Sequence, residues 1–133
     1  AVVEAVRAYP AAESLQQVGL WSLGSLAANF AGNAARIGRK GGVTHVISVM
    51  KGFVDNPAIQ EMGCWALANM AAGGGKPADY IVKKEGPAAV MGAMRKWDKN
   101  PNLQYAGLVA LAHLGSDAAM LKLMSMPAFV FFQ

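Results

Sequence analysis

The stretch QEMGCWALANMAAG, residues 60–73, decides the fold because two relatives of it occur elsewhere in the chain. QQVGLWSLGSLAAN (16–29) and QYAGLVALAHLGSD (104–117) align with it without a gap, each at an offset of 44 residues. One column of this alignment holds glutamine in all three copies, a second holds glycine and a third holds leucine. A period of about 40 to 47 residues is typical of stacked helical repeats. The sequence therefore predicts a helical solenoid.

The same offset relates the segments between these copies. IGRKGGVTHVISVMKGF (37–53) aligns with IVKKEGPAAVMGAMRKW (81–97), and the first residues of the chain align with the second half of both. We therefore predict a single all-α solenoid domain built from a partial repeat 1–30, full repeats 31–74 and 75–118, and a partial repeat 119–133.

Each repeat is predicted to contain three helices. Pro77 suits the first turn of a short helix that ends at Gly86, and Pro87 opens a second helix. Turn-forming residues then precede the third and longest helix, which is expected over about 103–114.

The third helix carries the phrase WALANMA (65–71), in which Asn69 follows Trp65 by one helical turn on the same face. In this phrase, in its period and in its predicted order of helices, the chain resembles armadillo repeats over essentially its whole length. Among them, it resembles the importin-α type most closely. The resemblance implies a right-handed superhelix whose third helices line a concave groove and whose second helices form much of the outer face.

The resemblance also implies a binding site in that groove. In the importin-α type, the tryptophan column forms shallow slots for the aliphatic stems of an extended peptide, and the asparagine column hydrogen-bonds the peptide backbone. Carried over by position and by neighbouring columns, the expected groove residues are Val18, Trp21, Ser25, Glu61, Met62, Trp65, Asn69, Tyr105, Val109 and His113. Because the groove offers little acidic charge beyond Glu61 and Asp117, we expect apolar or neutral partner segments rather than basic ones.

The alternative for Trp65 is a place in the core. Cys64, Leu67 and Met70 already form an apolar stripe at helical spacing, however, and Trp65 lies apart from it with Asn69. A buried asparagine would also need partners, which favours an open face.

Basic residues recur near the ends of first and second helices, in a chain with a formal net charge of +4. They are Arg36, Arg39, Lys40, Lys83, Lys84, Arg95, Lys96 and Lys99. The default interpretation is a solvated rim or outer face, and the alternative is a docking strip for an acidic partner or a membrane surface. No interleaved aromatic residues accompany the strip, so nucleic acid is not the expected partner.

No motif indicates catalysis or a cofactor. The segment GGGK (73–76) lacks the spacing of a phosphate-binding loop, and no nucleophile with an adjacent base is visible. His45, expected just before the second helix at the surface or in a capping contact, and His113 have no further metal ligands at suitable spacing. Cys64 is the only cysteine and is expected in the core, which favours a reducing intracellular compartment: the cytoplasm, or an organelle if a targeting segment has been removed.

Two functions follow as hypotheses. The first is a non-enzymatic protein–protein interaction scaffold that binds an extended partner segment in the groove. The alternative is a small structural subunit of a large multiprotein assembly, organellar or membrane-associated, held by its apolar ends and basic outer face. The apolar segment AFVFF (128–132) would be left bare at the end of the solenoid, so we expect either a longer array or neighbours that bury this end.

Overall fold

Residues 1–115, which are the part of the chain that the computed structural model describes, form eight α-helices and no strand. The helices are α1 (Val2–Ala8), α2 (Glu13–Asn29), α3 (Ala31–Arg39), α4 (Gly42–Gly52), α5 (Pro57–Ala71), α6 (Gly75–Lys83), α7 (Gly86–Lys96) and α8 (Pro101–Leu114). The predicted fold class, an all-α armadillo-type solenoid with three helices per repeat, is confirmed. Asp117, the predicted last repeat and the apolar segment 128–132 lie outside the described residues.

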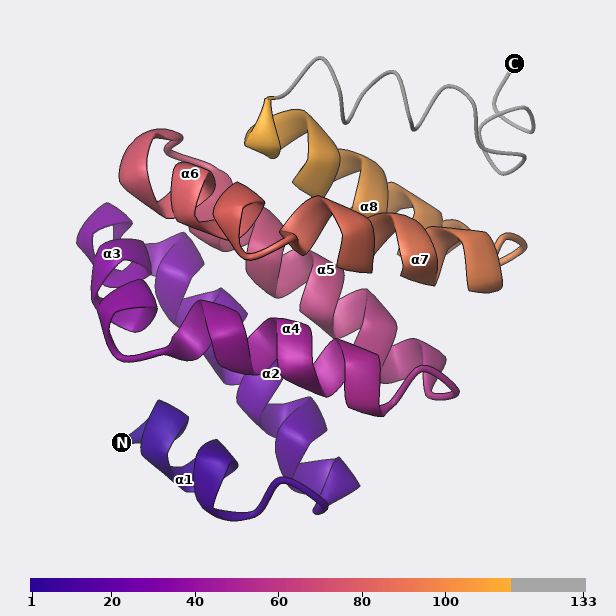
Figure 1. Cartoon of the computed structure of the whole chain (residues 1–133), viewed down its shortest axis with the longest axis horizontal. Coiled ribbons are helices and arrows are strands. Elements are labelled where there is room, and N and C mark those ends of the chain that lie inside the picture. The colour runs from indigo at the N-terminus through magenta and orange to yellow at the C-terminus, as the bar shows by residue number, and fades with distance from the viewer. Residues whose placement is uncertain (116–133) are drawn as a thin grey trace.

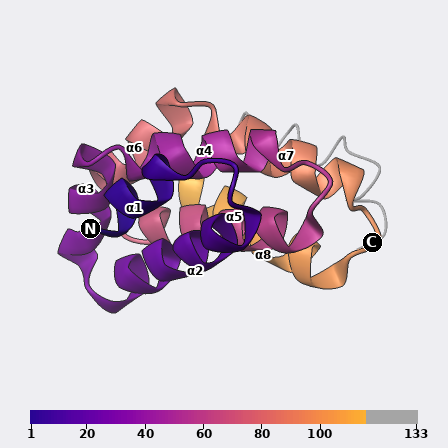
Figure 2. The ribbon, with the colours of Figure 1, turned by 90° about the horizontal axis from the view of Figure 1, so that it is seen from below.

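The helices are arranged in two main layers. The third helices of the repeats, α2, α5 and α8, pack side by side, and the second helices α1, α4 and α7 lie over them (Figure 1, Figure 2). The short first helices α3 and α6 contact each other at one end of this stack. Leu23, Leu67 and Leu111, one from each third helix, are almost fully buried in the core.

An asparagine and a proline fix the start of two third helices. The side chain of Asn56 accepts a hydrogen bond from the backbone N–H of Ile59 at 3.0 Å, and Asn100 does the same for Leu103 at 3.1 Å. Proline follows each of these caps at the first helical position, where its missing N–H costs nothing. The predicted start of the last helix, near residue 103, was therefore two residues too late.

The repeated glutamine ties each second helix to its third helix. The Gln60 Nε2 donates to the backbone carbonyls of Met50 and Phe53, at 2.8 and 2.9 Å, at the end of α4. Gln16 and Gln104 make the equivalent pairs of bonds, and all three side chains are buried. A helix leaves its last carbonyls without partners, and this one side chain satisfies two of them. The glutamine column is therefore structural.

The repeated glycine lets the two layers approach closely. A Cβ added at Gly63 would lie 2.5 Å from the Met50 Cγ, and one added at Gly107 would lie 2.5 Å from the Met94 Sδ. Met50 and Met94 are themselves 44 residues apart, so the same second-helix side chain occupies the space above each glycine.

Candidate binding groove

Apolar side chains stand exposed on the solvent side of α2, α5 and α8, which we call the third-helix face. Val18 is 60% exposed, Trp21 is 63% exposed and Tyr105 is 62% exposed. Trp65 lies between them, partly buried, with its ring centroid 5.7 Å from that of Tyr105 and the two planes tilted by 53°. Large exposed apolar groups gathered on one face are typical of a surface that meets a partner.

A pocket of about 210 Å³ opens between α2 and α5 on this face. Half of the expected groove residues line it, namely Trp21, Ser25, Met62, Trp65 and Asn69. Their neighbours Leu20, Gly24 and Ala66 complete the lining. A Cβ added at Gly24 would lie 3.2 Å from the Ala66 Cα, so the two helices nearly touch at the floor of this pocket. The flat indole and the amide of WALANMA thus border one hollow.

The asparagine column has a structural task that the sequence pattern did not indicate. The Asn69 Nδ2 donates to the backbone carbonyl of Gly24 on α2 at 3.1 Å. The His113 Nδ1, one repeat later, lies 3.0 Å from the carbonyl of Ala68, which accepts its hydrogen in the Nδ1–H tautomer. Gly24 and Ala68 occupy equivalent positions, and small residues there leave the carbonyl accessible. The bond uses one of the two Nδ2 hydrogens of Asn69, which leaves a donor and the carbonyl oxygen for another contact.

The remaining expected groove residues take varied positions. Glu61 and Val109 are partly buried, Ser25 is partly exposed at the pocket, and His113 is exposed. The buried stripe beside them is confirmed, because Cys64, Leu67 and Met70 are almost completely inaccessible.

Charge divides the two layers. No lysine or arginine occurs in α2, α5 or α8, whose formally charged side chains are Glu13 and Glu61. Every lysine and arginine of residues 1–115 belongs to a first or second helix or to the turn that follows one. The third-helix face is therefore apolar and weakly acidic, and the basic charge is carried by the other helices.

The predicted basic strip divides into two groups. Five of its members lie in the last turn of a first helix, α3 or α6, or directly after it, whereas Arg95, Lys96 and Lys99 lie in the last turn of α7 or just after it. Most of α7, which is about 16 Å long, separates this second group from Lys83 and Lys84. All eight side chains are exposed, and the Lys96 Nζ is paired with Asp55 at 2.9 Å.

The predicted position of His45 was wrong. The residue lies inside α4 rather than before a helix or at the surface, and its Nε2 donates to the Gln16 Oε1 at 2.7 Å. Burial lowers the pKa of the His45 imidazole, and the Arg7 guanidinium lowers it further, so the neutral ring is favoured. Its Nε2 must carry the hydrogen, because the amide oxygen of Gln16 accepts.

Cys64 is a free cysteine buried in the core. Burial raises the pKa of the Cys64 thiol to about 12, with the Glu61 carboxylate adding to the effect, so the reactive thiolate is scarce at neutral pH. Residues 1–115 contain no cluster of three or more histidine, cysteine or acidic side chains suited to a metal ion. None of the described helices is both long and apolar enough to cross a membrane.

A protein-family model described as "LRRK2 ARM repeat" matches residues 1–125. No curated protein and no solved structure matches the chain significantly.

Proposed function

Because the chain belongs to the LRRK2 ARM repeat family, we propose that it is a non-enzymatic interaction scaffold whose third-helix face binds an extended segment of a partner protein. A protein-interaction role is typical of armadillo repeats. The observation that supports the finer proposal is the pocket between α2 and α5, where Trp21, Trp65 and Asn69 from two successive repeats border one hollow.

The chemistry of the face specifies the kind of segment. The exposed rings of Trp21 and Tyr105 provide flat apolar surface, and Asn69 keeps an amide donor and acceptor for a peptide backbone. Without a lysine or arginine on these helices, an acidic segment has no countercharge there. An apolar or neutral segment suits the surface best. A basic residue in such a segment would find one carboxylate there, that of Glu61, and would gain only a weak additional contact.

The packing of the helices suggests why the segment would be extended. Adjacent packed helices lie about 8–10 Å apart, and an extended chain advances about 3.3 Å per residue. About every third residue of such a segment would therefore meet the next third helix. A helical partner would advance only about 1.5 Å per residue and would match this spacing less simply.

The test is capture of partners from native extract by matched variants. Trp21→Ala with Trp65→Ala removes the apolar surface of the face, and Tyr9→Ala removes an equally exposed aromatic ring elsewhere. We expect the first variant to lose a partner that the wild type and Tyr9→Ala both retain. A photoreactive amino acid at Val18 should then crosslink to one short segment of that partner.

The alternative, a structural subunit held by its outer face, is favoured by the concentration of basic residues on the first and second helices. The variant Arg95→Glu with Lys96→Glu separates the two functions. If this variant loses every partner while the tryptophan variant keeps them, the proposed groove is not the binding surface and the outer face is.

A further inference from the structure

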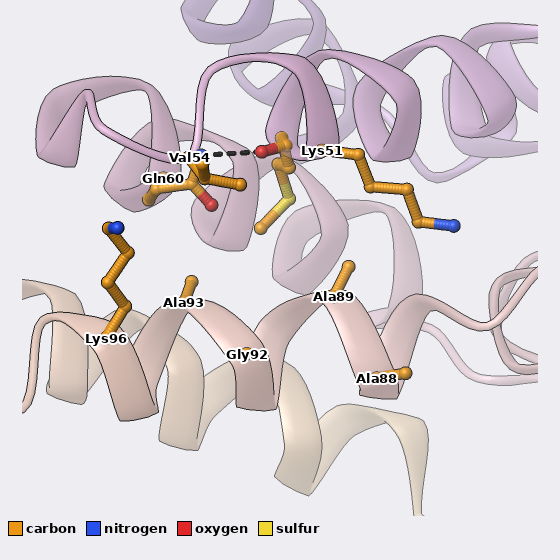
Figure 3. A pocket seen from close by; sticks show the side chains of 9 residues that line it. Lys51, Val54, Gln60, Ala88, Ala89, Gly92, Ala93 and Lys96 are labelled. Atoms are coloured by element: carbon orange, nitrogen blue, oxygen red, sulfur yellow. Dashed lines mark hydrogen bonds between the residues drawn. The ribbon is translucent and has the colours of Figure 1, made fainter.

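A second cavity lies in the other layer of the molecule, away from the third-helix face. It has a volume of about 270 Å³ and opens between α4 and α7 (Figure 3). Ala88, Ala89, Gly92 and Ala93 of α7 form one wall, with Met50, Lys51, Val54, Gln60 and Lys96 around the rest. Most of this lining is apolar, and the alanines and glycine of α7 leave the space open.

The equivalent junction one repeat earlier has larger side chains. The positions 44 residues before Ala88, Ala89 and Gly92 hold Thr44, His45 and Ser48. There the His45 imidazole reaches across and donates its Nε2 hydrogen to the Gln16 Oε1 at 2.7 Å. The cavity between α4 and α7 therefore corresponds to a place that a neutral, hydrogen-bonding ring occupies in the preceding repeat.

Gln60 presents the same acceptor to the cavity as Gln16 presents to His45. Gln60 is only 3% exposed, and its two Nε2 hydrogens are used by the carbonyls of Met50 and Phe53. These two bonds fix the orientation of the amide, and Figure 3 shows its oxygen pointing toward α7. Within residues 1–115 this oxygen has no protein hydrogen-bond partner, and it is not sealed off, since the buried side-chain oxygen without a partner is that of Gln104. The Gln60 oxygen is therefore an acceptor that a molecule in the cavity can reach.

We propose that this cavity is a binding site for a small, uncharged aromatic heterocycle that donates a ring N–H to the Gln60 Oε1. A donor is required because the amide oxygen only accepts. A flat ring suits the apolar walls, and the volume lies near the lower end of small-molecule pockets, about 300 Å³, which suits one or two fused rings. Lys51 and Lys96 at the rim disfavour a cationic donor.

The first test is a titration of the full chain with indole and, as a matched control, 1-methylindole, which lacks the N–H. Amide resonances of Ala89 and Gly92 would be followed by two-dimensional NMR at neutral pH. We expect saturable shifts with indole and roughly five- to tenfold weaker binding of 1-methylindole, as the loss of one hydrogen bond predicts. Equal affinities would show that apolar contact alone is responsible and would overturn the proposal, as would the absence of saturable shifts with indole.

The second test closes the cavity. Ala89→His places in α7 the residue that fills the preceding junction, so we expect it to abolish indole binding and to raise the Tm. Gly92→Ser narrows the same space more gently and should weaken indole binding without disturbing the fold. Ala112→His, on the exposed side of α8, is the matched control and should bind indole as the wild type does. Unchanged binding by folded Ala89→His would place the ligand elsewhere and contradict the assignment.

The reciprocal change opens a new site. His45→Ala removes the ring that bonds to Gln16, so we expect a lower Tm that added imidazole partly restores, and a second set of indole-dependent shifts near Gln16. If imidazole protects wild type and His45→Ala equally, the glutamine oxygen is not what recognises the ring.

Discussion

Glu85 is the only non-glycine residue within 1–115 with a positive φ, which is 66°. Its equivalent one repeat earlier is Gly41, with a φ of 84°, so both repeats use the left-handed conformation to turn from the first helix into the second. A side chain in this conformation costs about 1–2 kcal/mol that glycine avoids.

We therefore expect Glu85→Gly to raise the free energy of unfolding by about 1 kcal/mol, measured by urea denaturation. The reverse change, Gly41→Glu, should lower it by a similar amount. A destabilised Glu85→Gly would mean that the carboxylate makes a stabilising contact that outweighs the backbone strain.

Cys64 predicts how stability depends on alkaline pH. Burial raises its pKa to about 12 in the folded chain, so the folded state holds the proton more tightly than the unfolded state does. This contribution is fully present below the ordinary thiol pKa, about 8.5, and is lost as pH rises from there toward 12, by at most about 1.4 kcal/mol per pH unit. Denaturation of wild type and Cys64→Ala at pH 8 and pH 10 should show the steeper loss in wild type, and equal losses would contradict the burial of the thiol.

At the scale of the helix pair, glycine decides how closely two elements pack. Gly63→Ala pushes a methyl group against the Met50 Cγ, near the base of that side chain, so the layers must separate or Met50 must move. We expect a loss of about 1–3 kcal/mol in the free energy of unfolding, the usual cost of overpacking.

Gly38→Ala is the matched control, because a Cβ at this helical position has no neighbour within 4 Å. The same substitution should there be stabilising by about 0.4–1 kcal/mol, through helix propensity and reduced freedom of the unfolded chain. A stabilising Gly63→Ala would show that α4 and α5 have room to part.

Neighbouring third helices are bridged by the asparagine column. Asn69→Ala removes the bond to the Gly24 carbonyl and should cost about 1 kcal/mol, the typical net value of a hydrogen bond. Asn69→His should retain much of that stability, because His113 makes the equivalent bond to Ala68. Thermal denaturation of both variants tests this, and equal Tm losses would mean that histidine does not replace asparagine at this position.

Helix positions follow from local sequence, whereas contacts between repeats do not. The Asn-Pro pairs at 56–57 and 100–101 and the glycines before α6 suffice to predict where the turns lie, since each acts on its own backbone. The bonds of Asn69 to Gly24 and of His45 to Gln16 join residues 45 and 29 positions apart. Such bonds depend on how one repeat is rotated against the next, and the sequence within one repeat does not determine that rotation.

For the whole molecule, the 44-residue period was the decisive sequence signal, and the resemblance to armadillo repeats is confirmed by the family match over residues 1–125. The period predicts the fold because each repeat buries residues at the same positions against its neighbour. The binding site is less predictable, because surface residues at the Trp21 and Tyr105 positions are free of that packing constraint. The groove residues accordingly stay a prediction.

Because charge is separated between the layers, a change of ionic strength should affect partners of the two layers differently. Mobile ions screen exposed charges beyond about 10 Å at 0.1 M, but they leave apolar contact and short amide hydrogen bonds nearly unchanged. A segment seated on α2, α5 and α8, which lack lysine and arginine, should keep its Kd when sodium chloride rises from about 0.05 to 0.5 M. A partner held by the basic ends of α6 and α7 should be released over the same range. Washing a captured complex in steps of increasing salt would therefore divide its components by the face that each one occupies.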